Sequence, residues 1–195
     1  MKPTFSYTYL PSIDDLVARI EADSRAFAVV AISGFGGAGK STLASALGGR
    51  LGAPVVSIDE FGTPGALLRS DNWSGFDRLR LIQQLLGPIA AGARTLTYDS
   101  CDDWDSWQTA SVTLTLDRHL ILEGVGLFLS ALLPYLNWRL WLDVPLAVAT
   151  ARGKARARAL GREVEDLWHT VWEPNERAFA CAFQPRGRAH ILVRS

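Results

Sequence analysis

The sequence predicts an α/β fold built around a mainly parallel sheet. Four short and predominantly hydrophobic segments, residues 27–33, 54–58, 119–123 and 138–143, have the length of strands. Strands of this kind suit a sheet that is covered on both faces, as parallel sheets are. Segments with helical periodicity separate the four segments, and this alternation is typical of parallel α/β folds.

Length and composition support a single compact domain. The chain has 195 residues, and dividing by ~150 residues per domain gives about one. Hydrophobic residues make up 48% and charged residues 21%, which excludes a disordered chain. We therefore expect one domain spanning residues 1–195.

Charge and targeting features narrow the class of protein. Twenty Lys and Arg balance twenty Asp and Glu, so neither nucleic acid nor a membrane is an expected partner. The first ten residues do not resemble a secretory signal, and no apolar run has the ~18 residues of a membrane span. Cys101 and Cys181 are too few for a disulfide framework. These features predict a soluble, cytoplasmic protein.

The elements follow in order along the chain. In the N-terminal segment 1–26, Ser12 and Asp15 have the spacing of a capping box, and apolar residues then recur at helical spacing up to Ile20. After the strand 27–33 we expect a helix from Lys40 that Gly48 and Gly49 end. The remaining predicted elements are a strand 54–58, a helix 76–86 ended by Gly87 and Pro88, β-prone segments 95–98 and 111–116, strands 119–123 and 138–143, helices 144–160 and 164–183, and a strand 190–193.

The segment between the first predicted strand and helix carries a phosphate-binding motif. Gly34-Phe-Gly-Gly-Ala-Gly-Lys-Ser41 fits G-x-x-x-x-G-K-[ST] at every fixed position. Glycines let consecutive backbone N–H groups curl around phosphate oxygens, and the helix that follows adds its positive N-terminal end. A ligand-free glycine turn is the alternative, but a preceding strand and a following helix are the context that the motif requires.

This P-loop predicts ATP as a ligand and a three-layer P-loop NTPase fold. Lys40, which we expect at an exposed junction of loop and helix, would reach the β- and γ-phosphates, and Ser41 would ligate Mg²⁺. The predicted nucleotide-binding residues are Gly34, Phe35, Gly36, Gly37, Ala38, Gly39, Lys40, Ser41 and Thr42.

Carboxylates follow two of the predicted strands at the edge where α/β sheets bind ligands. Asp59 and Glu60 end the second strand, and Glu123 ends the third. A carboxylate at this edge can take a proton from an attacking hydroxyl or hold Mg²⁺ with Ser41. An ordinary turn residue at Asp59 and a solvent-exposed strand end at Glu123 are the alternatives. We predict Ser41, Glu123 and Asp59 as the metal-binding residues.

The order of these motifs resembles uridine kinases, which form one branch of P-loop kinases with phosphoribulokinases and bacterial-type pantothenate kinases. The resemblance rests on the P-loop, Ile58-Asp-Glu-Phe61, the segment 71–77, Tyr98-Asp99 and Leu120-Ile-Leu-Glu-Gly124. It implies that Asp59 is the general base for the acceptor hydroxyl and that Glu123 helps to hold magnesium. It also implies that Asp71 binds ribose hydroxyls and that Tyr98 lies beside the acceptor base.

Five cations follow the fourth predicted strand: Arg152, Lys154, Arg156, Arg158 and Arg162. A solvated helix face or a local nucleic-acid patch would explain them. In the kinases that the chain resembles, this region, here about residues 150–163, is a helical lid whose arginines contact the transferring phosphoryl group. Arg152 and Arg162 match lid arginines of the family. Two other lid positions hold Ala155 and Leu160, and Arg156 and Arg158 could substitute there.

The expected activity is phosphoryl transfer from ATP to a hydroxyl of a small molecule, with a uridine- or cytidine-like nucleoside as the first candidate acceptor. Asp103 stands where uridine kinases carry a histidine that contacts the pyrimidine, so the predicted substrate residues are Asp71, Tyr98 and Asp103. The predicted catalytic residues are Asp59, Lys40, Arg152 and Arg162. A pantothenate-like or sugar-phosphate alcohol and a slow regulatory ATPase remain alternatives, as does a homo-oligomer.

Overall fold

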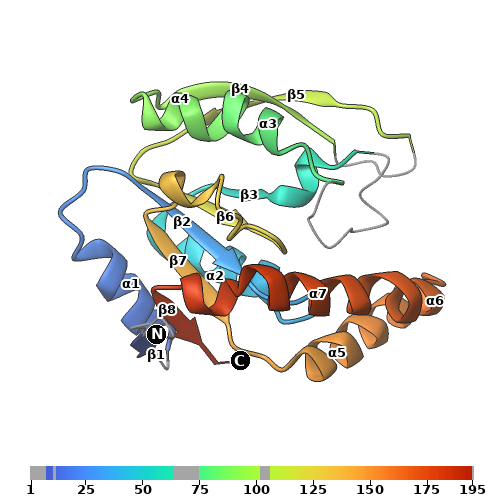
Figure 1. Cartoon of the computed structure of the whole chain (residues 1–195). Helices are drawn as coiled ribbons and strands as arrows, with labels where there is room; N and C mark the ends of the chain where they lie inside the picture. The colour runs from blue at the N-terminus through green and yellow to red at the C-terminus, as the bar shows by residue number, and fades with distance from the viewer. Residues whose placement is uncertain (1–7, 11, 64–74, 102–105, 195) are drawn as a thin grey trace.

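A computed structural model describes residues 8–10, 12–63, 75–101 and 106–194 and shows a six-stranded sheet. Its order is β1-β8-β7-β2-β6-β3, and every neighbouring pair is parallel (Figure 1). The strands are β1 (Thr8–Leu10), β2 (Ala28–Ser33), β3 (Val55–Ser57), β6 (His119–Glu123), β7 (Trp138–Leu142) and β8 (Ile191–Val193). The mainly parallel sheet is therefore confirmed, and β1 is a strand that the sequence patterns did not predict.

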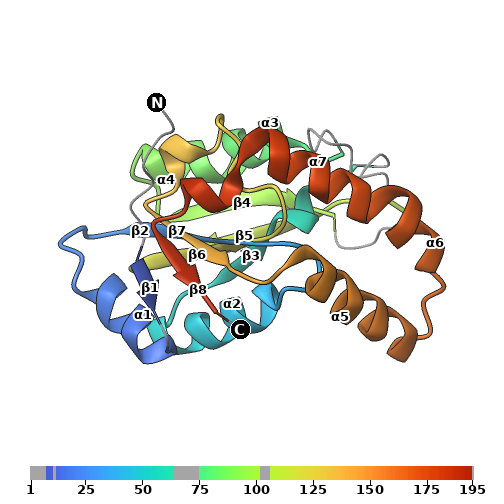
Figure 2. The same ribbon diagram turned by 60° about the horizontal axis from the view of Figure 1, so that its bottom comes forward.

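The strands bury both faces, which gives the fold its three layers (Figure 2). Val30 and Ile32 of β2 pack toward helices α1 (Ile13–Glu21) and α2 (Lys40–Leu51), whereas Val29 and Ala31 belong to the core on the opposite face. The opposite core is closed in part by Phe179 of helix α7 (Glu173–Phe183). This two-sided burial explains why the strands read as continuous hydrophobic runs.

A smaller unit lies over the β3 side of the sheet. Strands β4 (Thr95–Ser100) and β5 (Ala110–Thr115) form a separate antiparallel pair, at the top of Figure 1. One helical stretch packs beside them and is made of α3 (Arg78–Arg80), a π-helical turn (Leu81–Leu86) and α4 (Gly87–Ala90). The prediction of strands at 95–98 and 111–116 is confirmed.

A helical hairpin follows β7 in the chain and packs against the loop between β2 and α2. Helix α5 (Leu146–Ala159) runs beside α6 (Glu165–Leu167), a π-helical turn (Trp168–Trp172) and α7, as both views show. The predicted helices over 144–160 and 164–183 are confirmed. In the described part of the chain, no helix has the length and apolar character needed to cross a membrane.

The predicted end of α2 at Gly48 and Gly49 is wrong. The helix continues to Leu51, and its C-cap is Gly52, which has the left-handed φ of 60°. Gly48 is required for packing, because a Cβ there would lie 2.8 Å from Cγ2 of Val55. The glycine therefore lets the helix approach β3 closely and does not end it.

The predicted helix end at Gly87-Pro88 is also wrong. The N–H of Gly87 bonds to the carbonyl of Ile82, five residues earlier, which is the hydrogen bond of a π-helical turn. Pro88 then lies in the first turn of α4, where a missing N–H is tolerated. Because of this wider turn, the helix continues past Pro88.

Candidate active site

The P-loop joins β2 to α2 and curls through two glycines with positive φ, Gly37 at 86° and Gly39 at 99°. A Cβ at Gly37 would lie 2.1 Å from the carbonyl oxygen of Ala149 in α5, so backbone conformation and space both require glycine. A small polar cavity of about 80 Å³ opens beside this loop. Its lining residues are Gly36, Gly37, Gly39, Lys40, Ser41, Thr42, Asp59, Glu123, Gly124, Val125 and Arg156.

Other predicted P-loop residues do not line this cavity and pack against neighbouring elements instead. Phe35 packs edge-on against Trp141 at a ring distance of 5.3 Å, and Ala38 is fully buried. Gly34 packs against Leu142 of β7. These contacts fix the loop against the sheet.

Lys40 is buried, whereas the sequence predicted an exposed position for it. It is only 8% exposed, and its Nζ donates a hydrogen bond of 3.0 Å to the carbonyl of Phe35. The side chain therefore folds back over the loop, with its charge at the cavity that the loop amides enclose. This position suits a cation that acts on phosphate.

Glu123 is 7% exposed at the end of β6, which excludes the solvent-exposed strand end considered above. Its Oε1 accepts a hydrogen bond of 3.0 Å from Ser41 Oγ. Burial raises the pKa of the Glu123 carboxyl, and the nearby Asp59 carboxylate acts in the same direction, whereas Lys40 and the Ser41 hydrogen bond partly offset them. A buried carboxylate of this kind is ready to pair with a cation.

The three predicted metal-binding residues line one cavity. Ser41, Asp59 and Glu123 offer hydroxyl and carboxylate oxygens, the donor set that Mg²⁺ prefers. The residues therefore fit a magnesium ion beside the P-loop.

Asp59 and Glu60, adjacent in sequence, have different environments. Both lie on a 3-10 turn (Ile58–Phe61) that follows β3, and Asp59 lines the P-loop cavity. Glu60 instead accepts hydrogen bonds from the Ser57 N–H at 2.9 Å, from Tyr98 Oη at 2.7 Å and from Ser100 Oγ at 2.8 Å. Glu60 thus holds the 3-10 turn in place through these hydrogen bonds. Asp59 is the carboxylate of this turn that lines the cavity.

Tyr98 is buried, with an exposed fraction of 3%. Its ring stacks on Phe61 at 5.5 Å, and its hydroxyl donates to Glu60. Burial and the Glu60 carboxylate raise the pKa of Tyr98. In this structure the tyrosine supports the turn that carries Asp59, and its contact with a substrate stays a prediction.

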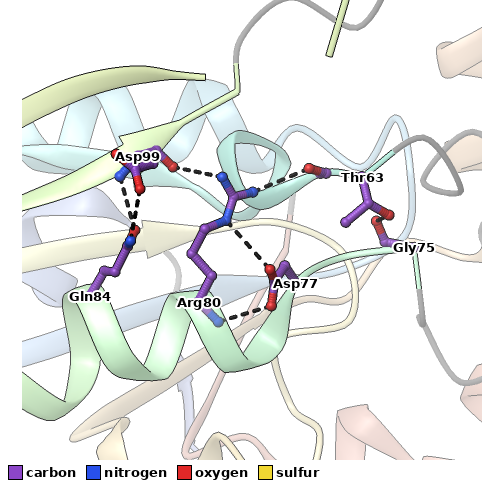
Figure 3. A network of polar contacts seen from close by, with 7 residues as sticks. Thr63, Gly75, Asp77, Arg80, Gln84 and Asp99 are labelled. Carbon is purple, nitrogen blue, oxygen red and sulfur yellow. Dashed lines mark hydrogen bonds and ion pairs between the residues drawn. The ribbon is translucent and has the colours of Figure 1, made fainter. Parts of the chain in front are cut away.

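Asp71 and Asp103, the other two predicted substrate residues, lie outside the described residues. Both segments that carry them begin beside Arg80, the centre of the network in Figure 3. The guanidinium of Arg80 donates to the carbonyl of Gly62 at 3.2 Å and to that of Asp99 at 2.9 Å.

The residues on either side of segment 64–74 form hydrogen bonds with each other. The Thr63 hydroxyl donates to the carbonyl of Gly75 at 2.8 Å, and Gly62 and Phe76 form an isolated β-bridge. Gln84 binds the side chain and the N–H of Asp99 at 2.9 Å each. The described residues that flank the two segments are therefore held together beside the Asp59 turn.

The five cations of the predicted lid segment have different environments. Lys154 and Arg158 contact the Glu165 carboxylate at 3.1 and 2.8 Å, and together they lower the pKa of Glu165. Arg156 is, within the described ranges, the one cation of the cluster that lines the P-loop cavity. Arg162 lines a separate hollow at the turn between α5 and α6 instead, and Arg152 lines neither.

Helical spacing explains the position of Arg156 once the contact between α5 and Gly37 is known. Ala149 and Gly153 are the α5 residues that approach Gly37, and Arg156 follows Gly153 by three positions on the same helix face. The predicted roles of Arg152 and Arg162 at the phosphoryl group stay predictions.

Glu176 is a polar residue of the site that the sequence patterns did not identify. It is fully buried on α7, and its Oε2 accepts a hydrogen bond of 2.9 Å from the N–H of Gly36 in the P-loop. Trp172 and Phe179, at helical spacing on the same face, are buried too. A carboxylate on a buried helix face was the signal available in the sequence.

The sequence matches no protein-family model and no curated protein sequence. Two solved structures match nearly the whole fold. A structure described as a possible uridine kinase from Bacillus stearothermophilus has a TM-score of 0.73 at 20% identity, covering 93% of this chain and 96% of that one. A protein from Silicibacter sp. TM1040, assigned as a fructose transport system kinase, has a TM-score of 0.71 at 23% identity, covering 93% and 98%.

At these identities the likeness establishes the fold. The chain shares its three-layer α/β fold with these two structures. The predicted fold class is confirmed, and the resemblance to uridine kinases is confirmed at the level of the fold.

The buried position of Glu123 leads to a prediction for Glu123→Gln. Because burial raises the pKa of Glu123 in the folded protein, the ionised carboxylate destabilises the metal-free fold above that pKa, and the penalty is relieved as the pH falls through it. We expect the metal-free variant to have a higher Tm than the wild type at pH 7, with a smaller difference at lower pH. The Mg²⁺ concentration for half-maximal activity should rise ~10- to 100-fold.

Thermal unfolding in a chelator and a magnesium titration of activity measure the two effects. The matched control is Glu163→Gln, which changes an exposed carboxylate near the end of α5. An unchanged magnesium requirement in Glu123→Gln would remove this residue from the metal site.

Proposed function

We propose that this protein is an ATP-dependent kinase that transfers the γ-phosphoryl group to a hydroxyl of a small molecule. The observation that carries the proposal is one cavity lined by the P-loop, Lys40, Asp59 and Glu123. A P-loop alone accounts for nucleotide binding. Asp59, a partly exposed carboxylate that lines the same cavity as Lys40, adds the group that an acceptor hydroxyl requires.

Each residue has a distinct task in this reaction. Lys40 and the loop amides hold the phosphates, and Ser41 and Glu123 hold Mg²⁺, which neutralises phosphate charge when bound. Asp59 receives the proton of the acceptor hydroxyl as that oxygen attacks the γ-phosphorus. Arg156 stabilises charge on the transferring group, and Arg152 and Arg162 would join it if the lid segment 150–163 moves toward the cavity.

The nucleoside of the donor has a candidate site beside the P-loop. A larger cavity of about 620 Å³ extends from Phe35 and is lined by Trp141, Val144 and Pro145, with polar groups from Gln184 and from an Arg186–Asp143 ion pair. Apolar walls with a few fixed polar groups are typical of sites that bind a base. Its contact with Phe35 joins it to the phosphate-binding loop.

The acceptor that we propose first is a uridine- or cytidine-like nucleoside, bound by Asp71, Tyr98 and Asp103. One matching structure is described as a possible uridine kinase, which favours this acceptor. The other is assigned as a fructose transport system kinase, which favours a sugar alcohol. A pantothenate-like or sugar-phosphate alcohol is therefore the second candidate within the same reaction.

An assay of ADP release with a panel of acceptors tests the activity. The panel contains pyrimidine and purine nucleosides, pantothenate, free sugars and sugar phosphates, each with ATP and Mg²⁺. Strong stimulation by one acceptor class supports the kinase and identifies the acceptor. Slow turnover that no acceptor stimulates would instead support a regulatory ATPase.

The lid proposal predicts a change in hydrogen exchange. We propose a single kinase domain over residues 1–195 in which residues 150–163 form a lid, because the like charges of Arg152, Arg156 and Arg162 repel one another until phosphate binds. A non-hydrolysable ATP analogue should slow amide exchange across residues 152–162 and leave α1, which does not line the P-loop cavity, unchanged. Unchanged exchange at 152–162 on a bound analogue would favour a solvated helix face.

A further inference from the structure

We propose that Glu176 is a positioning residue that shapes the phosphate-binding loop through the N–H of Gly36. The inference rests on the proposed function, since it concerns how the P-loop is prepared for ATP. Glu176 and Gly36 are 140 residues apart in the chain, and the hydrogen bond between them is 2.9 Å long.

Burying the Glu176 carboxylate costs hydration free energy, which hydrogen bonds must offset. It is fully buried, and Trp172 and Phe179 on the same face of the helix are buried aromatic residues. An apolar side chain could complete that packing, whereas a buried carboxylate needs hydrogen-bond donors to offset its lost hydration. The N–H of Gly36 is such a donor, so the buried carboxylate is stabilised in part by its hydrogen bond with the loop.

The hydrogen bond holds the tip of the loop from outside the cavity. Gly36 lines the cavity, but its N–H is directed to α7 and is engaged by Glu176. The next residue, Gly37, lies against the backbone of α5 at Ala149 and Gly153. The tip is therefore held at two successive residues by the two arms of the helical hairpin.

Trp168 connects these two arms. A Cβ at Gly153 would lie 2.5 Å from the Trp168 ring, and Trp168 packs edge-on against Trp172 at a ring distance of 5.0 Å. The loop, α5 and the helix that carries Glu176 thus form one close-packed stack. A stack of this kind fixes where the remaining loop amides point before any nucleotide arrives, and such preorganisation strengthens binding.

Two effects of the carboxylate have opposite signs. As a hydrogen-bond acceptor it holds Gly36 and favours phosphate binding, whereas the negative charge of its ionised form would oppose an anionic ligand. Glu176→Ala removes both effects, and Glu176→Gln keeps an oxygen that can accept from Gly36 while removing the charge. The pair of variants therefore separates positioning from charge.

Equilibrium binding of MgATP by calorimetry tests the proposal. We expect Glu176→Ala to raise the Kd for MgATP ~10- to 100-fold, the range for losing a hydrogen bond to a charged acceptor, while Glu176→Gln retains most of the affinity. The KM for the acceptor should not change in either variant. The matched control is Glu173→Ala on the same helix, whose carboxylate pairs with Arg177 near the surface at 2.9 Å.

Circular dichroism and the Tm of each variant show how much protein is folded, and affinities are compared per folded molecule. Wild-type affinity in folded Glu176→Ala, or tighter binding in both Glu176 variants, would overturn the proposal. If Glu176→Ala does not fold, Glu176→Asp shortens the side chain by one methylene and should weaken MgATP binding in the same direction. A wild-type protein that binds no MgATP would instead refute the proposed function, and this inference with it.

Discussion

Replacing Lys40 by alanine should reduce acceptor-dependent turnover by ~10²- to 10³-fold or more, the loss typical of removing one preorganised donor at a reacting oxyanion. Lys40 lines the P-loop cavity, and its Nζ lies 3.0 Å from the Phe35 carbonyl. The charge is therefore already at the loop before nucleotide arrives. The variant is measured by ADP release at saturating acceptor, with MgATP affinity determined separately.

Lys154→Ala is the matched control for Lys40→Ala. Lys154 carries the same charge, but its Nζ lies 3.1 Å from Glu165 in the helical hairpin and does not line the cavity. We expect its effect on turnover to be far smaller. Because Lys40 is largely buried, the Tm of Lys40→Ala must also be measured, and near-wild-type turnover in the folded variant would exclude the lysine from catalysis.

Replacing Asp59 by asparagine should reduce acceptor-dependent turnover by ~10²- to 10⁴-fold, the usual contribution of a general base. The amide keeps the shape of the side chain but cannot take the acceptor proton. MgATP affinity should change far less, because Lys40 and the loop amides make most of the phosphate contacts. Turnover and affinity measured on the same preparation therefore distinguish a base from a metal ligand.

Glu60→Gln provides the comparison for Asp59→Asn. Glu60 follows Asp59 in sequence, but its carboxylate is bound by Tyr98, Ser100 and the Ser57 N–H. We expect this variant to lower the Tm and to affect turnover less than Asp59→Asn. Parallel loss of ATP binding and turnover in Asp59→Asn would assign Asp59 to the metal or to the fold, and full activity would remove it from the site.

Predictions that depended on neighbouring residues in the chain were successful. The P-loop occupies eight consecutive positions, and two of its glycines, Gly37 and Gly39, adopt positive φ values. Asp59 and Glu123 reach one cavity because the carboxyl ends of parallel strands meet at one edge of a sheet. The strands themselves were recognisable because burial on both faces leaves a continuous hydrophobic run.

Predictions that depended on packing partners far along the chain were less successful. Gly48 and Gly87 were predicted as helix ends. In the structure, Gly48 lies within α2, where it packs closely against Val55. Gly87 closes a π-helical turn with Ile82, and the helix continues beyond it. The contacts of Tyr98 with Phe61 and Glu60 are further long-range contacts that the sequence patterns did not indicate, and the predicted contact of Tyr98 with a substrate stays a prediction.

The sequence by itself determined the fold class, the phosphate-binding loop and the two carboxylates beside it, because each follows from a local pattern of spacing or hydrophobicity. Only the tertiary structure decided which lid cation lines the cavity and which helix holds the loop tip. Arg156 lines the cavity because α5 approaches Gly37 at Ala149 and Gly153. Glu176 reaches Gly36 across 140 residues because α7 packs over the same loop, and no spacing along the chain encodes a contact that the packing of separate elements creates.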